Sequence, residues 1–227
     1  VNFLTSLKGE SLITLIYHRK LDAAWQAAAE ELSQQLTLAV KASYPVKVMG
    51  RSRGQKLVLT DDFIMEEFCL DPAQPEQKLV YKQLEGSFTQ PNPYACQAML
   101  NWAKKVTQPA AGAAKQDLLE LYCGNGNFTL ALAENFNQVL GTEVSRTSVA
   151  AGQFNTAANA IKNVAIERLS AEDFALAQAS LAAGQPNEEA VKLNLAAYGF
   201  STLLVDPPRA GLDSATLKQA QGFERLV

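Results

Sequence analysis

Cysteine is scarce in this sequence of 227 residues, and the few cysteines present are not arranged as a disulfide or metal site requires. The three, Cys69, Cys96 and Cys123, are odd in number and show no CxxC spacing. Disulfide frameworks and structural zinc sites need paired or clustered cysteines. The pattern therefore argues against both classes, predicts that no metal is bound, and fits a protein of the reducing cytoplasm.

Long apolar runs are also missing. A helix that crosses a bilayer needs about 20 predominantly apolar residues, and the sequence contains no such run and no stretch typical of a signal peptide. We therefore expect no membrane partner. The sequence starts at Val1 rather than Met and ends at Val227 as an apolar segment begins, so we expect a piece of a longer protein. Nothing in it indicates an oligomeric state.

A strong net charge of one sign is lacking too, but the charges are unevenly spread. The formal net charge is −3, yet residues 1–60 hold eight basic and four acidic residues, against 12 and 19 in the remainder. A basic segment can face a polyanion such as a nucleic acid. Ordinary surface variation gives similar counts, so the charge alone leaves both interpretations open.

The first part of the chain mixes strand and helix patterns. A helix is expected at 22–40, where Asp22 is a candidate N-cap ahead of an apolar stripe. Short β-rich runs predict strands at 11–17, 46–49, 56–60 and 79–84, with a turn at 50–54 and a further helix at 93–106. We therefore predict a smaller α+β domain over residues 1–85, facing RNA, and a second domain over 86–227.

The second part alternates strands and helices. Strands are expected at 117–122, 138–143, 164–169 and 201–205, and helices at 127–135, 147–161 and 172–182. A polar insertion with some helix is expected at 184–197. Such alternation predicts an α/β fold, in which a parallel sheet carries helices on both faces.

A glycine-containing loop follows the first strand of this α/β part. Gly124 and Gly126 allow a tight turn and close backbone approach to a ligand. The third glycine of GxGxxG and the Lys-Ser/Thr of a phosphate-binding P-loop are both missing. Glu143 ends the next strand, where an acid can accept both hydroxyls of a ribose. Together these features favour a nucleoside site, although a plain turn and a helix-capping Glu143 remain the alternative.

A second motif, Asp206-Pro207-Pro208-Arg209-Ala210-Gly211-Leu212-Asp213, follows the strand at 201–205. Ligands of open α/β sheets bind beyond the carboxyl ends of strands. Two consecutive prolines stiffen this turn, so it can hold Asp206 and a flat prolyl face against a planar base. The alternative is a simple strand exit.

These motifs together resemble a known family. LLELYCGNGNF, the strand ending in Glu143, VDPPRAGLD, the upstream SFTQPN and the YHRKLD segment are similar to the bacterial tRNA (uracil-5-)-methyltransferases, which make 5-methyluridine in the T-loop. The resemblance implies a Rossmann-like domain that binds S-adenosylmethionine, and tRNA, through its T-arm, as the partner. It also implies the residues that contact or shape the cofactor site, namely Gln90, Tyr122, Gly124, Asn127, Glu143 and Asp206.

The family mechanism implies catalytic residues that this sequence does not contain. In the family a cysteine adds to carbon 6 of uracil, carbon 5 takes the methyl group, and a carboxylate removes the carbon-5 proton. That cysteine follows the DPPR motif in a Ser-Cys-Asn-Pro segment, and the glutamate comes later, so both are expected beyond Val227. Cys123 lies in the cofactor loop, and Cys69 and Cys96 match no motif. We therefore expect the chain as given to bind cofactor without turnover.

Three other interpretations stay open. Ribosomal-RNA uracil-5-methyltransferases share these motifs, and often carry an upstream iron–sulfur cysteine cluster. An enzyme that methylates an amino group of DNA or RNA normally has an aromatic residue where Arg209 follows the two prolines here. A non-catalytic RNA-binding module on a methyltransferase fold would share everything except the catalytic residues.

Overall fold

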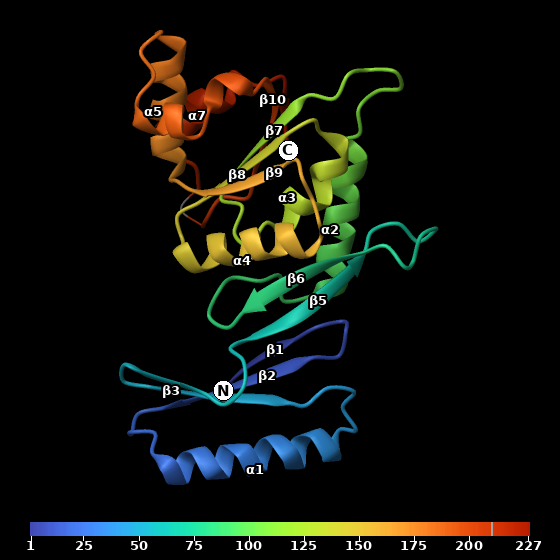
Figure 1. Ribbon diagram of the computed structural model, residues 1–227, viewed down its shortest axis with the longest axis vertical. Helices are drawn as coiled ribbons and strands as arrows, with labels where there is room; N and C mark the ends of the chain where they lie inside the picture. Colours follow the sequence, from blue (N-terminus) through green and yellow to red (C-terminus); the bar gives the residue numbers. More distant parts are fainter. Residues whose placement is uncertain (210) are drawn as a thin grey trace. The chain divides into compact units, whose positions relative to one another are not determined.

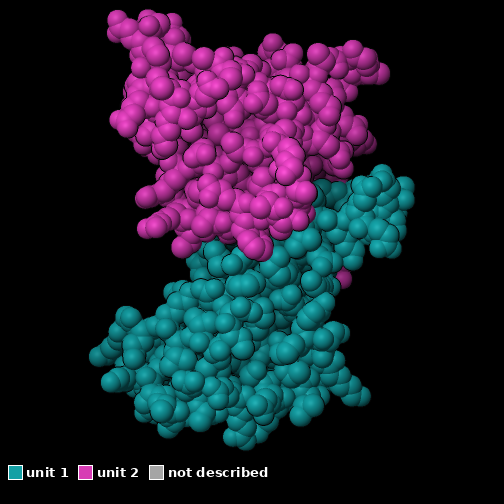
Figure 2. Space-filling model, viewed as in Figure 1, with its two compact units in different colours: residues 1–93 teal, residues 94–227 magenta. Residues whose placement is uncertain are grey.

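The computed structural model describes residues 1–209 and 211–227, and it consists of two compact units, Val1–Pro93 and Tyr94–Val227 (Figure 2). Ala210 of the second motif lies outside the described residues. The boundary expected after residue 85 lies in the segment between the last strand of the first unit and the helix that begins at Pro93. Each unit is described by itself below.

The first unit is an α+β structure with a four-stranded sheet in the order β1-β2-β3-β4 and a separate two-stranded sheet, β5-β6 (Figure 1). The elements are β1 (Asn2–Thr5), β2 (Ser11–Tyr17), α1 (Ala23–Ala39), β3 (Lys47–Ser52), β4 (Gln55–Val58), β5 (Phe63–Cys69) and β6 (Lys78–Leu84). β2 and β3 are parallel, and α1 forms the crossover between them. The β1–β2, β3–β4 and β5–β6 pairs are antiparallel.

Local sequence signals explain how α1 is placed on this sheet. Asp22 caps the helix, because its side chain accepts a hydrogen bond from the Trp25 backbone N–H at 2.9 Å. Trp25 and Ala29 are the buried positions of the helix, and they pack with Val48 of β3. A Cβ built on Gly50 would lie 2.6 Å from the Trp25 ring, so only glycine lets the indole lie this close to β3.

The second unit is a parallel α/β structure with the strand order β11-β10-β7-β8-β9. Its elements are α2 (Pro93–Val106), β7 (Asp117–Leu121), α3 (Asn127–Leu132), β8 (Val139–Glu143), α4 (Arg146–Ala158), β9 (Val164–Arg168), α5 (Ala171–Ala182), α6 (Glu188–Lys192), β10 (Phe200–Val205), α7 (Ser214–Ala220) and β11 (Arg225–Leu226). All four strand pairs are parallel. The predicted α/β class is thereby confirmed.

Both faces of this sheet are covered by helices, because successive strand residues point to opposite sides. Leu119 and Leu121 of β7 pack in one cluster with residues of α5, including Phe174. Leu118 packs in another cluster with Ala103 of α2 and with residues of α3. Figure 1 shows α5 and α7 on one side of the sheet and α2, α3 and α4 on the other. The central strands are therefore buried on both faces: every position of β7 and all but the last of β8 are buried.

Some local expectations were wrong. The turn expected at 50–54 is shorter, since β3 continues to Ser52 and only Arg53 and Gly54 separate it from β4. Gly54 has φ +79°, which suits glycine in a two-residue hairpin turn. Tyr122 lies beyond the end of β7 rather than inside it. β1 and β5 were not expected.

The predicted absences can be compared with the described part of the chain only. No helix among those residues is both long and apolar enough to cross a bilayer. Within the same ranges, no group of three or more potential ligands from His, Cys, Asp and Glu is arranged to hold a metal ion. Cys69, Cys96 and Cys123 are free thiols.

Candidate functional site

The candidate site lies at the carboxyl edge of the parallel sheet, where the strand order changes direction. From β7 the chain goes to β8 and β9 on one side and then returns to β10 on the other. Leu121 is in register with Val205 of β10 and with Thr142 of β8. The residues that follow on the three strands, Asp206, Tyr122 and Glu143, are therefore neighbours at this edge. Such a switch point is the usual ligand crevice of open α/β sheets.

The glycine loop between β7 and α3 uses backbone conformations that few residues adopt. Gly124 and Gly126 have φ +56° and +82°, and Tyr122 itself has φ +61°. A Cβ on Gly126 would lie 2.7 Å from the side chains of Ile166 and Leu130, so glycine is required there for packing as well as for φ. A Cβ on Gly124 would meet nothing within 4 Å. The loop is therefore packed against the protein at Gly126 and open at Gly124.

Glu143 connects this loop to the next helix. One carboxylate oxygen accepts the Gly124 backbone N–H at 3.1 Å, and the other accepts the Ser145 backbone N–H at 2.8 Å. The side chain is half-buried. Ser145 in turn caps α4 by accepting from the Ser148 backbone N–H. Glu143 can therefore both support the start of α4 and accept hydrogen bonds from a ribose. Backbone donors hold its carboxylate in place, and each oxygen keeps a lone pair for a ligand hydroxyl.

Two residues that sequence reasoning missed hold the loop from α4. Asn155 is fully buried and donates its side-chain amide to the Asn125 carbonyl at 3.0 Å. Gly152 lies so close that a Cβ there would be 3.3 Å from the Asn125 carbonyl carbon and 2.8 Å from Ile166. A buried asparagine in an otherwise apolar helix face is a usable signal, since buried amides are almost always hydrogen-bonded.

Asn127, the first residue of α3, contacts a cysteine from another helix. Its side-chain nitrogen lies 3.3 Å from the sulfur of Cys96 on α2. Cys96 is buried, with 3% of its surface exposed. Sulfur is a weak hydrogen-bonding partner, and this contact ties the first residue of α3 to α2.

Tyr122 turns its ring toward α7. The ring packs against the cluster formed by Leu119 and Leu121. Burial raises the pKa of the Tyr122 hydroxyl, a hydrogen bond with Thr216 lowers it, and the nearby charge of Asp213 raises it further. Asp213 caps α7 through the Ala215 and Thr216 backbone N–H groups. Tyr122 therefore ties the strand end to the start of α7.

Glu120 is a buried acid beneath the site that sequence reasoning did not single out. It is 2% exposed, and its carboxylate accepts the Thr129 hydroxyl at 2.6 Å. Burial raises its pKa to about 8; the Thr129 hydrogen bond opposes this shift, and the nearby charge of Asp206 adds to it. Glu120 is thus mostly protonated at neutral pH, while Asp206 is exposed just beyond the end of β10. The sequence feature that could have identified Glu120 is an acid among the leucines of DLLEL, the strand β7.

Cys123 follows Tyr122 in the loop but is unsuited to nucleophilic attack. It is 4% exposed. Burial, together with the charges of Glu120 and Glu143, raises its pKa well above the ordinary thiol value. A cysteine reacts as the thiolate, so this buried thiol is a packing residue of the loop rather than a nucleophile.

Gln90 is the member of the predicted set that belongs to the first unit. It is half-buried in the segment between β6 and α2. The other five, Tyr122, Gly124, Asn127, Glu143 and Asp206, all lie in the second unit, at or just after the ends of β7, β8 and β10.

Comparisons with known proteins agree with this geometry. The family model described as tRNA (Uracil-5-)-methyltransferase matches residues 1–227. The tRNA/tmRNA (uracil-C(5))-methyltransferase of Acinetobacter baumannii (strain AYE) is 48% identical over 227 residues, which is 100% of this chain and 58% of the relative. The enzyme of that name from Aromatoleum aromaticum is 49% identical, over 100% of this chain and 56% of its own length. The chain therefore spans somewhat over half the length of these relatives.

Solved structures show the same fold at low sequence identity. The Pyrococcus abyssi tRNA (uracil-54, C5)-methyltransferase in complex with S-adenosyl-L-homocysteine has a TM-score of 0.59 and 17% identity, over 95% of this chain and 45% of that one. Methanocaldococcus jannaschii Trm5 in complex with adenosine has a TM-score of 0.52 and 10% identity, over 100% of this chain and 58% of that one. At these identities the likeness establishes the Rossmann-like methyltransferase fold.

Proposed function

Because the chain belongs to the tRNA (uracil-5-)-methyltransferase family, we propose that the protein transfers a methyl group from S-adenosylmethionine to carbon 5 of a uridine in the T-arm of tRNA. The observation that carries this proposal in the structure is the position of Glu143. Its carboxylate is held beside the glycine loop by two backbone donors, at the switch point of a parallel sheet. That arrangement suits the ribose of a nucleoside cofactor.

The residues at the sheet edge fit such a cofactor. Glu143 would accept the ribose hydroxyls, and the open side of Gly124 leaves room for the ligand against the loop backbone. Asn127 and the exposed Asp206 supply further polar groups, and the family resemblance implies Gln90 as a further contact. When bound, S-adenosylmethionine supplies the electrophilic methyl group. The neutral, protonated state of Glu120 keeps a second negative charge away from Asp206 at neutral pH.

A direct test is methyl transfer by the full-length protein. Incubated with radiolabelled S-adenosylmethionine and unmodified tRNA, it is expected to incorporate label as 5-methyluridine in the T-loop, identified by nuclease digestion and mass spectrometry. Ribosomal RNA serves as the competing substrate and should stay unlabelled. Preferential labelling of ribosomal RNA would instead support the alternative that the protein is a ribosomal-RNA uracil-5-methyltransferase. Label on an amino group would contradict methylation of carbon 5.

The RNA-facing role proposed for the first unit is supported by a hollow at the β3–β4 hairpin. It has a volume of about 450 Å³, and its lining includes the basic residues His18, Arg51, Arg53 and Lys56. Arg51 pairs with Glu85 at 2.6 Å and Lys56 pairs with Asp62. Lys47, a basic residue of the same strand as Arg51, is different. It is mostly buried and pairs with Glu10 and Asp61, so it stabilises the unit rather than facing a ligand.

We expect the Arg51→Ala/Arg53→Ala double variant of the full-length protein to bind tRNA more weakly and with a shallower salt dependence. Arginines that hold phosphates release counterions on binding, and each lost contact reduces the slope of log Kd against log salt by about 0.9 for duplex nucleic acid. Filter binding across a salt series measures this slope. Cofactor affinity should stay unchanged and serves as an internal control. If the slope of log Kd against log salt is unaltered, the β3–β4 hairpin faces solvent and does not contact the tRNA phosphates.

We place the protein in the cytoplasm. The free state of Cys69, Cys96 and Cys123 fits a reducing compartment, and tRNA as proposed partner agrees with it.

A further inference from the structure

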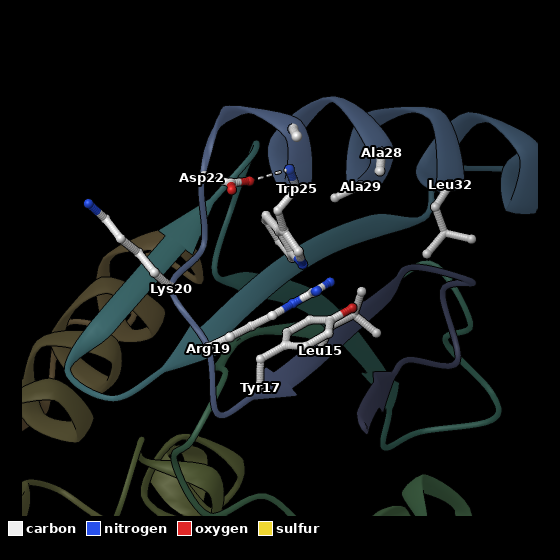
Figure 3. A pocket seen from close by; sticks show the side chains of 10 residues that line it. Leu15, Tyr17, Arg19, Lys20, Asp22, Trp25, Ala28, Ala29 and Leu32 are labelled. Atoms are coloured by element: carbon white, nitrogen blue, oxygen red, sulfur yellow. Dashed lines mark hydrogen bonds between the residues drawn. The ribbon is translucent and has the colours of Figure 1, made fainter.

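A second hollow in the first unit combines an apolar wall with the guanidinium of Arg19. It lies between α1 and the end of β2 and has a volume of about 370 Å³ (Figure 3). Its lining includes Leu15, Tyr17, Arg19, Trp25, Ala28 and Leu32. This volume falls within the range of small-ligand pockets, which are mostly apolar with a few placed polar groups. We call it the Arg19 pocket.

The guanidinium of Arg19 lies over the aromatic ring of Tyr17. Its central carbon is 5.7 Å from the centre of the Tyr17 ring, and the Tyr17 and Trp25 rings meet edge to face at 6.1 Å. Figure 3 shows Arg19 beside the Tyr17 ring, with Lys20 pointing away from it. Across the described residues, no carboxylate forms an ion pair with Arg19. Its donors are therefore available to an anion.

The acid in the pocket lining does not neutralise this cation. Asp22 uses its carboxylate to cap α1 by accepting from the Trp25 backbone N–H. The pocket rim thus has a positive balance, from Arg19 and the exposed Lys20 against one committed carboxylate. Charge complementarity selects an anionic ligand, and the flat aromatic surface selects one with a planar group.

The segment that presents Arg19 is held rigidly by the β3–β4 hairpin. The Ser52 hydroxyl donates to the Arg19 carbonyl, and the Gln55 side chain accepts the Leu21 backbone N–H at 3.0 Å. The close contact of Gly50 with Trp25 fixes the indole from below. A ligand therefore meets a preformed surface, and less conformational entropy is lost on binding.

We propose that the Arg19 pocket holds one unpaired nucleotide of the RNA substrate. The base packs against Tyr17 and the apolar face of α1, and the flanking phosphates contact Arg19 and Lys20. Proteins recognise RNA largely through unpaired bases stacked on aromatic rings and arginine planes, and a guanidinium matches phosphate oxygens in a bidentate manner. This assignment rests on the proposed function insofar as it takes RNA as the substrate.

Tryptophan fluorescence of the full-length protein can report on this pocket. Of the two tryptophans in this sequence, Trp102 is 60% exposed, so Trp102→Phe leaves Trp25 as the reporter within these residues. Titration with a T-arm hairpin RNA is expected to quench Trp25 emission to saturation. In the same background Arg19→Ala should raise Kd for the hairpin, and KM for tRNA, about tenfold. The kcat at saturating tRNA and the affinity for S-adenosylhomocysteine should not change, which excludes misfolding.

Two further variants separate the guanidinium from charge in general. Arg19→Lys keeps the charge but loses the planar fork, so it should recover only part of the affinity. Lys41→Gln, which removes an exposed cation beyond the end of α1 and outside the pocket lining, should behave as the unsubstituted protein. An Arg19→Ala protein with unchanged Kd and KM would overturn the proposal.

The ligand class and the proposed function are tested separately. If a polyglutamate peptide quenches Trp25 emission as strongly as the RNA does, the ligand of the pocket is an acidic peptide. That result would overturn the assignment to a nucleotide. If the unsubstituted protein binds the hairpin through Arg19 but transfers no methyl group, the proposed function fails while the pocket stands. If it methylates tRNA and Arg19→Ala matches it in every measurement, only the pocket fails.

Discussion

A polypeptide consisting of residues 1–227 is expected to bind S-adenosylhomocysteine and to transfer no methyl group to tRNA. The five proposed cofactor residues of the second unit, Tyr122, Gly124, Asn127, Glu143 and Asp206, all lie within this polypeptide. The chemistry requires a cysteine thiolate, and none of the three cysteines fits. Cys123 has a raised pKa and is buried, Cys96 is buried against Asn127, and Cys69 belongs to the first unit, where its thiol donates to the Asp71 carbonyl.

Radiolabel incorporation into tRNA measures this prediction, with S-adenosylhomocysteine binding by calorimetry as evidence that the polypeptide is folded. The full-length protein provides the positive control in the same assay. A Cys123→Ser variant of residues 1–227 should also be inert and should retain binding. Label incorporated at an enzymatic rate by residues 1–227 would contradict both the assignment of Cys123 to packing and the proposed mechanism.

Much of the second unit could be predicted from sequence because its signals are local. Strands β7, β8 and β10 each contain adjacent apolar residues, and each ends in the turn or acid that the sequence identified. The helix expected at 93–106 matches α2 at both ends. Alternation of strand and helix fixes a parallel sheet, and a parallel sheet places consecutive strand ends together. The proximity of Glu143 and Asp206 to the glycine loop follows from that topology.

The first unit was predicted less completely because some of its signals depend on tertiary contacts. In β5 the inward positions are Ile64, Glu66 and Phe68, so a buried acid interrupts the apolar alternation. Glu66 is tolerated because its carboxylate accepts the Leu7 and Glu67 backbone N–H groups. β1, over Asn2–Thr5, is short and exposed. Neither strand could be recognised by periodicity alone.

The same reason explains what was missed near the site. Asn127 and Cys96 are 31 residues apart and meet only when α2 packs on the sheet. Lys47 carries a charge that, from sequence, resembles its basic neighbours. Its inward position on β3, beside Glu10 and Asp61, makes it a structural ion pair. Composition can count charges, but only packing determines which of them face solvent.

Glu143→Ala in the full-length protein is expected to weaken S-adenosylmethionine and S-adenosylhomocysteine binding by about 1 to 3 kcal/mol, or about five-fold to 150-fold in Kd. The variant loses charge-assisted hydrogen bonds to the ribose. It also loses the hydrogen bonds that the Glu143 carboxylate accepts from the Gly124 and Ser145 backbone N–H groups. The loop is then less well ordered for the ligand. Calorimetry with each ligand measures the loss.

Matched variants separate these two contributions. Glu143→Gln keeps one side-chain oxygen for a backbone donor but lacks the charge, so its affinity should lie between those of Glu143 and Ala. Glu188→Ala removes an exposed carboxylate from α6, in the connection leading to the amino end of β10, and should leave Kd unchanged. Thermal melting shows whether each variant is folded. A folded Glu143→Ala protein that binds both ligands as tightly as the unsubstituted protein would remove Glu143 from the cofactor site, and with it the observation on which the proposed function rests.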